Sequence, residues 1–314
     1  MEGINLNQIG VSFKGSGSYV PNQILTNQEI SKKVETSDEW IKSRTGISQR
    51  RISGLSENVS EMGYKAALGA IEMARWDIET IDLIILATST PNDLFGSAPE
   101  IQSKLGAINA VAFDLTAACS GFLFAAITAT QFLKAGSYKR AVVIGSDQLS
   151  SYVDWNDRRS CILFGDGAGA IAIEGTNELD NLIGFSMRTD GQRGSFLNLP
   201  SQNNQDLIID DINFSSGGFS SISMNGQEVY KFAVREVPLI IDNLFNQKVR
   251  DPRHENLTQF HMDIAASIQK VTEDIMIKLT KSLKDEFNIP NLCLAGGVAL
   301  NCVCLLYTSP SPRD

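Results

Sequence analysis

The chain has 314 residues, of which 43% are hydrophobic, and carries a formal net charge of −9. A chain of this length can bury a substantial core and usually forms two domains or one large one. The acidic balance argues against nucleic acid and anionic membranes as partners. The sequence has no run of about 18 apolar residues and no basic-then-apolar N-terminal signal, which predicts neither a membrane span nor a leader.

The cysteine content predicts a reducing compartment, and hence a cytoplasmic protein. The five cysteines are Cys119, Cys161, Cys293, Cys302 and Cys304. They form no CxxC pair and no even disulfide framework. Cys302 and Cys304 lie near the C-terminus without other ligand candidates, so no metal site is predicted there.

Strand-like apolar segments alternate with helix-like segments through the first 175 residues. The predicted strands cover residues 9–19, 81–88, 110–115, 140–146 and 161–174. The predicted helices cover residues 27–34, 59–75, 99–105 and 119–136, with Asn27 and Ser60 as expected N-terminal caps. The continuous apolar strand at 81–88 is typical of a strand buried on both faces. This alternation predicts an α/β layered fold with a mostly parallel core.

A second segment begins at residue 182. Residues 182–188 predict a strand, and residues 226–245 predict an amphipathic helix that Pro238 would kink. Between them, the Asn-, Asp- and Ser-rich stretch 200–220 predicts a polar loop. That loop is either a solvated insertion, which is the favoured interpretation, or a lid over a site.

The sequence around Cys119 is the strongest candidate for chemistry. An apolar strand at 110–115 is followed by a small-residue turn and an apolar helix, and Cys119 lies where the helix begins. Unpaired N–H groups and the positive end of the helix dipole favour a thiolate there. A thiolate at a strand-to-helix turn suits acyl transfer. The alternative is that Cys119 is a small buried hydrophobic residue, as free cysteines often are.

Five motifs together resemble the β-ketoacyl-acyl-carrier-protein synthase III family of the thiolase superfamily. They are GSYVPNQILTN (17–27), TSDEWIKSRTGI (36–47), FDLTAACSGF (113–122), DWNDRRSCILFGDGAGA (154–170) and SMNGQEVYKFAV (223–234), within a match over residues 8–245. The resemblance implies a thiolase-like layered αβαβα fold. Its N-terminal half, residues 1–180, would be complete and its C-terminal half, residues 181–245, truncated. It also implies a homodimer, joined through the strand at 111–115 and the loop around Phe95.

The resemblance further implies roles for single residues. Cys119 would be the nucleophile that accepts the acyl group. The positions that match the family's coenzyme A contacts are Trp40, Arg44, Arg158 and Gly226. Phe95 and Met224 match positions at the acyl pocket or the dimer contact. The implied partners are acetyl-CoA, which is a substrate rather than a cofactor, and acyl carrier protein; no separate cofactor is implied.

The last part of the chain departs from that family. Condensation there uses a His and an Asn, typically in HQAN-like and GNTSA-like motifs, and neither motif occurs after residue 245. The only histidines are His254 and His261. Residues 250–303 instead resemble part of an O-carbamoyltransferase. We therefore expect a foreign segment over 246–303 and a disordered tail over 304–314, which resembles a translated sequencing adapter.

The favoured function is that of a β-ketoacyl-acyl-carrier-protein synthase III. Such an enzyme is an acyltransferase that condenses acetyl-CoA with malonyl-acyl-carrier protein to initiate fatty acid biosynthesis. This chain is expected to be impaired, because the His and Asn are missing. The alternatives are a non-functional chimeric chain and, less favoured, a carbamoyltransferase.

Overall fold

A computed structural model describes residues 10–177, 180, 182, 184–209 and 212–245 of the chain. The chain divides into two compact units, Met1–Leu244 and Phe245–Asp314, and the described residues belong almost entirely to the first. The predicted segments 246–303 and 304–314, with His254 and His261, lie outside the described residues. No helix in the described part is long and apolar enough to cross a membrane.

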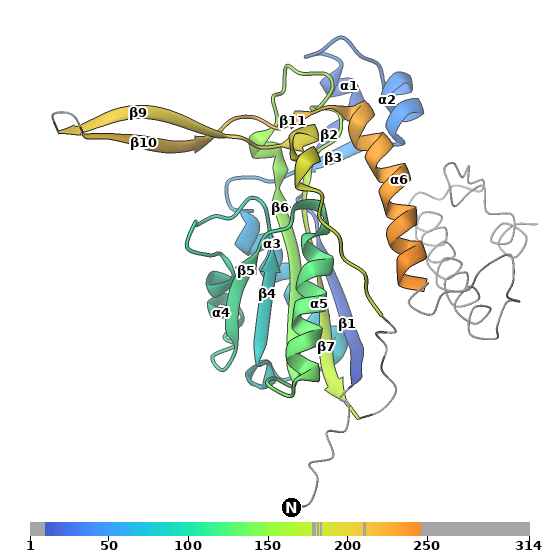
Figure 1. Cartoon of the computed structure of the whole chain (residues 1–314), viewed down its shortest axis with the longest axis vertical. Helices are drawn as coiled ribbons and strands as arrows, with labels where there is room; N and C mark the ends of the chain where they lie inside the picture. The colour runs from blue at the N-terminus through green and yellow to red at the C-terminus, as the bar shows by residue number, and fades with distance from the viewer. Residues whose placement is uncertain (1–9, 178–179, 181, 183, 210–211, 246–314) are drawn as a thin grey trace, which may run out of the picture. The chain divides into compact units, whose positions relative to one another are not determined.

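A five-stranded mixed sheet forms the centre of the first unit (Figure 1). Its strand order is β1 (Gly10–Tyr19), β7 (Asp166–Thr176), β6 (Arg140–Gln148), β4 (Leu83–Ala87) and β5 (Val111–Leu115). β4 pairs in parallel with β5 and β6, whereas β7 pairs antiparallel with β6 and β1. The prediction of a mostly parallel core is therefore wrong for the half of the sheet that contains β7 and β1.

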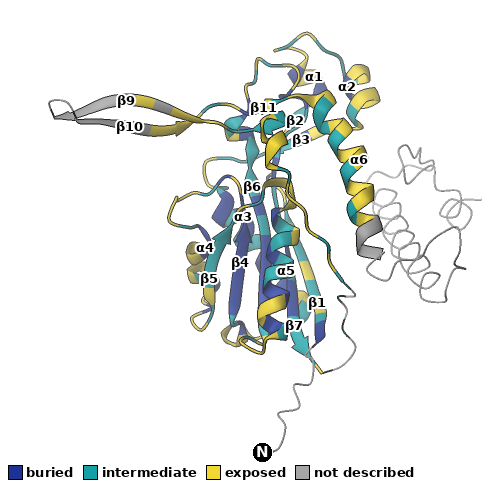
Figure 2. Ribbon diagram, viewed as in Figure 1, coloured by how far each residue is buried: buried dark blue, intermediate teal, exposed yellow. Residues whose placement is uncertain are grey.

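Helices cover both faces of this sheet. α3 (Val59–Ala74) and α4 (Ala98–Leu105) pack on one face, and α5 (Gly121–Lys134) packs on the other. Alternate residues of β4 divide between them: Ile84 and Leu86 face α3, while Leu83 and Ile85 face α5. All residues of β4 are buried (Figure 2), which confirms the prediction of a strand buried on both faces.

Glycine allows β1 to approach α3 unusually closely. A Cβ atom at Gly17 would lie 2.1 Å from the backbone oxygen of Ala66 in α3, so any side chain would force the strand and the helix apart. This approach fixes α3 across β1 and β7. The glycines of the GSGSY sequence thus serve helix–strand packing.

A smaller layer lies beside the main sheet. The strand β2 (Gln23–Thr26) pairs antiparallel with β3 (Gln49–Ile52), and the helices α1 (Asn27–Ile30) and α2 (Asp38–Thr45) lie in the connection between these two strands. Ile30 of α1 and Ile41 of α2 are buried in an apolar cluster with Cys161 and Ile162. Residues 158–163 form consecutive turns, so the strand predicted from residue 161 begins only at Asp166.

The expected helix caps are wrong at two positions. Thr26, rather than Asn27, caps α1: its hydroxyl accepts the Glu29 N–H, and the Glu29 carboxylate accepts the Thr26 N–H. Asn58, rather than Ser60, caps α3 by accepting the Glu61 N–H. In both helices the capping side chain comes just before the first helical residue, where the backbone is still extended.

Residues 184–245 differ most from the prediction. Residues 184–190 are irregular, not a strand. The expected polar loop instead contains a hairpin of β9 (Ser201–Ile209) and β10 (Ile212–Phe219). A strand needs a paired neighbour, and these two strands pair with each other, whereas the described residues supply none for 184–190. The helix α6 (Gly226–Phe245) matches its prediction and continues through Pro238. Before it, two-residue strands β8 (Leu197–Asn198) and β11 (Ser223–Met224) pair.

Candidate active site

The turn between β5 and α5 places Cys119 on the surface. Residues Ala118–Ser120 form a 3₁₀ turn, and α5 starts at Gly121. Ala118 has a φ of 47°, a left-handed conformation that costs energy in a non-glycine residue. Cys119 is exposed and lies in this turn, two residues before the first residue of α5. The alternative interpretation of Cys119 as a buried hydrophobic residue is wrong.

Cys161 provides the contrast within the described part of the chain. It is buried, and burial raises the pKa of its thiol. A buried cysteine with a raised pKa stays protonated and inert at neutral pH. Of these two cysteines, Cys119 is therefore the one that an acyl donor can reach.

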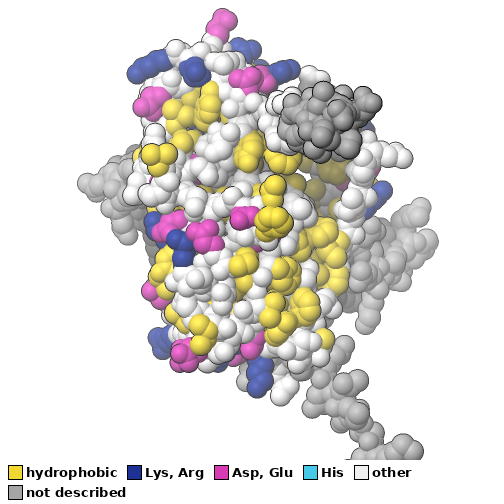
Figure 3. Space-filling view, turned by 90° about the vertical axis from the view of Figure 1, so that its left-hand side faces the viewer, with side chains coloured by type: hydrophobic (Ala, Val, Ile, Leu, Met, Phe, Trp, Pro, Cys, Tyr) yellow, Lys and Arg dark blue, Asp and Glu magenta, His cyan; other side chains and the backbone are white. Residues whose placement is uncertain are grey.

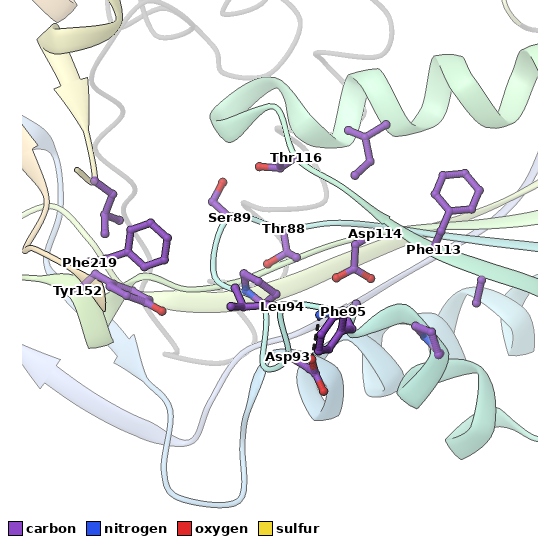
Figure 4. Close-up of a pocket in the computed structure, with 16 residues that line it drawn as sticks. Thr88, Ser89, Asp93, Leu94, Phe95, Phe113, Asp114, Thr116, Tyr152 and Phe219 are labelled. Atoms are coloured by element: carbon purple, nitrogen blue, oxygen red, sulfur yellow. Dashed lines mark hydrogen bonds between the residues drawn. The ribbon is translucent and has the colours of Figure 1, made fainter. Parts of the chain in front are cut away.

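A cleft of about 640 Å³ opens beside β5 (Figure 4). It is lined by β5 itself, by the loop 88–96 and by Tyr152 and Phe219. Thr116, three residues before Cys119, also lines it. Phe95 is 99% exposed at this cleft. The cleft thus lies next to the turn that carries Cys119 and offers an apolar wall.

The predicted site residues divide among different places. Among the described residues, Phe95 alone of the predicted set lines this cleft. Met224 ends β11 and Gly226 begins α6, where a Cβ atom on Gly226 would lie 3.7 Å from the Met224 Cε. The tunnel expected to join Cys119, Arg158, Met224 and Gly226 stays a prediction.

Three of the residues predicted to contact coenzyme A lie close together. Trp40 and Arg44 are on α2, and Arg158 is in the turns at 158–163. The Arg44 guanidinium carbon lies 5.8 Å from the centre of the Trp40 ring, and that of Arg158 lies 5.1 Å from it. Arg158 also donates a hydrogen bond of 2.9 Å to the Glu35 carbonyl. Two cations therefore flank one partly exposed indole, an arrangement suited to a flat ring that carries phosphate groups.

Sequence reasoning missed a carboxylate that holds the start of the cleft loop. The Asp147 Oδ1 accepts hydrogen bonds from the Ser89 N–H at 2.8 Å and from the hydroxyls of Thr90 and Thr88 at 3.1 and 3.2 Å. Burial raises the pKa of Asp147 although these bonds act to lower it. The available signal was an acidic residue at the end of the apolar strand AVVIGSD.

A second missed carboxylate holds the end of the same loop. Asp114 on β5 accepts the N–H groups of Ser97 and Ala98 at 2.8 and 2.6 Å, where α4 begins. An acidic side chain is favourable at a helix N-terminus. With both ends fixed by carboxylates on the sheet, the loop presents Phe95 outward.

Comparison with known proteins identifies the family. A synthase III of Prochlorococcus marinus subsp. pastoris, strain MED4, named β-ketoacyl-[acyl-carrier-protein] synthase III, is 85% identical over 295 residues, which are 94% of this chain and 88% of that protein. This chain belongs to the β-ketoacyl-acyl-carrier-protein synthase III family. The family profile described as 3-oxoacyl-[acyl-carrier-protein] synthase III matches residues 113–191, which include Cys119 and Arg158.

Solved structures of synthase III enzymes share the fold. The enzyme of Aquifex aeolicus VF5 is 36% identical, with a TM-score of 0.65 over 77% of this chain and 73% of that one. The enzyme of Pseudomonas aeruginosa PAO1 is 32% identical, with a TM-score of 0.63 over 74% and 70%. The thiolase-like α/β fold is confirmed.

A second profile confirms the other resemblance. The profile described as carbamoyltransferase N-terminus matches residues 196–307, so the match begins well before the residue 250 expected from the sequence. The alignment with the MED4 synthase III covers 94% of the chain and therefore also extends past residue 250. The two similarities overlap from residue 196 onward.

Proposed function

We propose that this synthase III family member accepts an acetyl group from acetyl-CoA on Cys119 and passes it toward malonyl-acyl-carrier protein, the first condensation of fatty acid biosynthesis. One observation carries the proposal: Cys119 is exposed at the start of α5 in a chain 85% identical to a named synthase III. Its acyltransferase chemistry follows from that nucleophile.

The first half-reaction uses residues within the described part. The Cys119 thiolate attacks the acetyl carbonyl carbon, a new C–S bond forms, and the bond to the coenzyme sulfur breaks, releasing coenzyme A as a thiolate. The Cys119 backbone N–H is our candidate donor to the oxyanion of the tetrahedral intermediate.

The cluster of Trp40, Arg44 and Arg158 is proposed to hold the nucleotide end of the coenzyme. The indole offers an aromatic face for adenine, and the guanidinium groups can donate paired hydrogen bonds to phosphate oxygens. Gly226, at the start of α6, and Met224 are assigned to the path between this cluster and Cys119. We propose that acyl-CoA enters as substrate and that no separate cofactor takes part.

The second half-reaction is proposed to be impaired. Malonyl decarboxylation releases CO₂ and leaves an enolate. Its carbon attacks the acetyl carbonyl carbon, so that a C–C bond forms, the C–S bond to Cys119 breaks, and the cysteine leaves as a thiolate. The family stabilises that enolate with a His and an Asn, and the sequence holds neither motif after residue 245. Loss of one such group removes about 10²–10⁴-fold in rate. The carbamoyltransferase match at 196–307 favours a chimeric chain as the alternative explanation for these missing motifs.

Acetylation with radioactive acetyl-CoA tests both halves. We expect slow label on Cys119, none on Cys119→Ser, and unchanged label on Cys161→Ser, which removes the buried cysteine. No acetoacetyl product should form from malonyl-acyl-carrier protein, and His254→Ala and His261→Ala should change nothing. A folded chain that takes no label, or that condenses at the rate of a complete synthase III, would refute the proposal.

We also propose that two copies pair along β5. This strand is the last of the sheet, so one of its edges has no neighbour in the described chain. Val111 is 49% exposed there, and Leu94 and Phe95 of the cleft loop are more exposed still. Figure 3 shows hydrophobic side chains gathered on the side of the molecule where α4 and β5 lie. A partner strand would cover them.

Light scattering on the full chain tests this dimer. The wild type should have twice the chain mass, and Val111→Lys should be a monomer because it places a charge in the contact. The control is Leu239→Lys on α6, where Leu239 is similarly exposed at 48%, and it should remain dimeric. A monomeric wild type would rule the dimer out. The cytoplasmic location inferred from the cysteines stays a prediction.

A further inference from the structure

The side chain of Arg50 lies buried between the two segments that carry the Trp40 cluster. Arg50 is a β3 residue and is only 4% exposed. Its Nε donates a hydrogen bond of 3.0 Å to the Ile162 carbonyl, and one terminal nitrogen donates to the same oxygen. The other terminal nitrogen donates to the Asn27 Oδ1. One guanidinium thus joins residues 23 positions before it and 112 positions after it.

On one side the contacts lead directly to α2. Asn27 is buried, and its amide donates to the Asp38 Oδ1 and to the Ile47 carbonyl, both at 2.8 Å. Asp38 is the first residue of α2, and Ile47 follows shortly after its end. Both ends of α2, which carries Trp40 and Arg44, are therefore tied to Asn27 and through it to Arg50.

On the other side the contacts lead to Arg158. The Cys161 N–H donates to the Asp157 carbonyl at 3.0 Å, closing a turn that contains Arg158 and ends next to the buried Ile162. The following segment packs directly on β3. A Cβ atom at Gly165 would lie 3.2 Å from the Arg50 Cβ. The turn therefore has a fixed position relative to Arg50.

A buried guanidinium is costly unless its N–H groups find acceptors. Among the residues that the structure describes, Arg50 donates to a carbonyl and to an amide oxygen rather than to a carboxylate, so charge neutralisation does not account for its burial. What this planar group supplies is geometry, because it donates in fixed directions to both segments at once. These two segments carry Trp40 and Arg158, whose guanidinium carbon lies 5.1 Å from the centre of the Trp40 ring.

We propose that Arg50 is a positioning residue for the coenzyme end of the site, which sets the spacing between α2 and the turn that carries Arg158. This inference rests on the proposed function of the Trp40 cluster. Because Arg50 is buried, we expect it not to touch the coenzyme itself. It acts only by holding the indole and the Arg158 guanidinium in register for the nucleotide.

The test compares two acetyl donors on the full chain. Acetyl-CoA carries the nucleotide, whereas S-acetylpantetheine has the same thioester and lacks it. With Arg50→Met we expect the second-order rate of Cys119 acetylation by acetyl-CoA to fall about tenfold or more, because misplaced binding groups lose much of their effect. The rate with S-acetylpantetheine should be unchanged. Trp40→Ala should show the same pattern, and adding Arg50→Met to it should cause a smaller further loss than Arg50→Met causes alone, because only the Arg158 contact is then left to misplace.

Arg51→Met is the matched control. Arg51 is the next residue of β3, points to the opposite face and donates to the Pro21 carbonyl, so both rates should stay at the wild-type level. Should Arg50→Met fail to fold, Asn27→Ala decides, since it cuts the link to α2 and leaves Arg50 its bonds to Ile162. Equal losses with both donors, or no loss with acetyl-CoA, would overturn the inference. If Trp40→Ala also leaves the acetyl-CoA rate unchanged, the proposed coenzyme site itself is wrong.

Discussion

Two regions of the described chain, residues 10–177 and residues 184–245, bury their apolar side chains to very different extents. In the first, helices cover both faces of the sheet, and each residue of β4 is buried. In the second, Ile222 is the only buried hydrophobic residue among those whose side chains the structure describes. The second region nevertheless forms a 20-residue helix. Local sequence signals can therefore specify a helix where burial adds little to its stability.

Within the second region, ion pairs connect α6 to residues 188–193. The Glu236 carboxylate of α6 lies 3.1 Å from the Arg188 guanidinium and 2.7 Å from that of Arg193. By contrast, α6 exposes an apolar stripe of Tyr230, Val234, Val237 and Ile241. We infer that the free energy of unfolding resides in the first region, while the second can open locally.

The largest expected effect comes from one substitution made in both regions. Leu86→Ala removes a fully buried side chain from β4 and should destabilise the chain by about 2–5 kcal/mol, because it loses burial and leaves a cavity. Leu239→Ala on α6, where the side chain is 48% exposed, should change stability by less than about 0.5 kcal/mol. Urea unfolding measures both. Similar losses would show that α6 contributes to the core after all.

The pH dependence of stability offers a second, smaller test of the first region. Burial raises the pKa of Asp147 above its ordinary value of 3.8. Between that value and the raised one, the folded state holds a proton that the unfolded state has lost, so stability falls as pH rises through this window. Asp147→Asn cannot ionise, but its side-chain carbonyl oxygen can still accept the three hydrogen bonds that the Oδ1 accepts in the wild type. The variant should lack this component of the fall.

Urea unfolding at a series of pH values from 3 upward measures the free energy of unfolding of the wild type and of Asp147→Asn. The difference between the two gives the contribution of Asp147. Asp157→Asn serves as the opposite control, because the hydrogen bond from Arg159 lowers the pKa of Asp157. Its carboxylate stabilises the folded state above its ordinary pKa, and this contribution is lost as pH falls. A wild-type-minus-variant difference that rises with pH for Asp147 would contradict burial as the dominant influence.

Sequence patterns gave good predictions where the determining interactions were local. The helix at 226–245 was correct at both ends, and Cys119 was placed correctly at the start of its helix. Thr26 was missed as a cap although Glu29 stands three residues later, the spacing of a reciprocal cap. The strand expected at 182–188 failed because strand formation depends on a partner, and hydrophobic pattern alone does not supply one.

The motif resemblance named the side chains proposed to contact a ligand, whereas the side chains that support one another were missed. Trp40, Arg44 and Arg158 came from a motif resemblance, and their convergence is visible in the fold. Arg50 and Asp147 have partners distant in sequence, so no spacing rule points to them. Their roles depend on the tertiary fold that brings those partners together.

The smallest expected effect tests how α6 is held. Glu236→Gln removes both ion pairs with Arg188 and Arg193, which are exposed to solvent and hence contribute little to stability. Amide hydrogen exchange in residues 226–241 should quicken by roughly fivefold, with the urea midpoint of the whole chain unchanged. Salt at 1 M, where the Debye length is about 3 Å, should shrink the difference. Lys231→Gln is the control, since Lys231 pairs with Glu228 inside the same helix and does not tie α6 to residues 188–193. Faster exchange in Lys231→Gln than in Glu236→Gln would show that the helix opens by fraying within itself, not by release from its arginine partners.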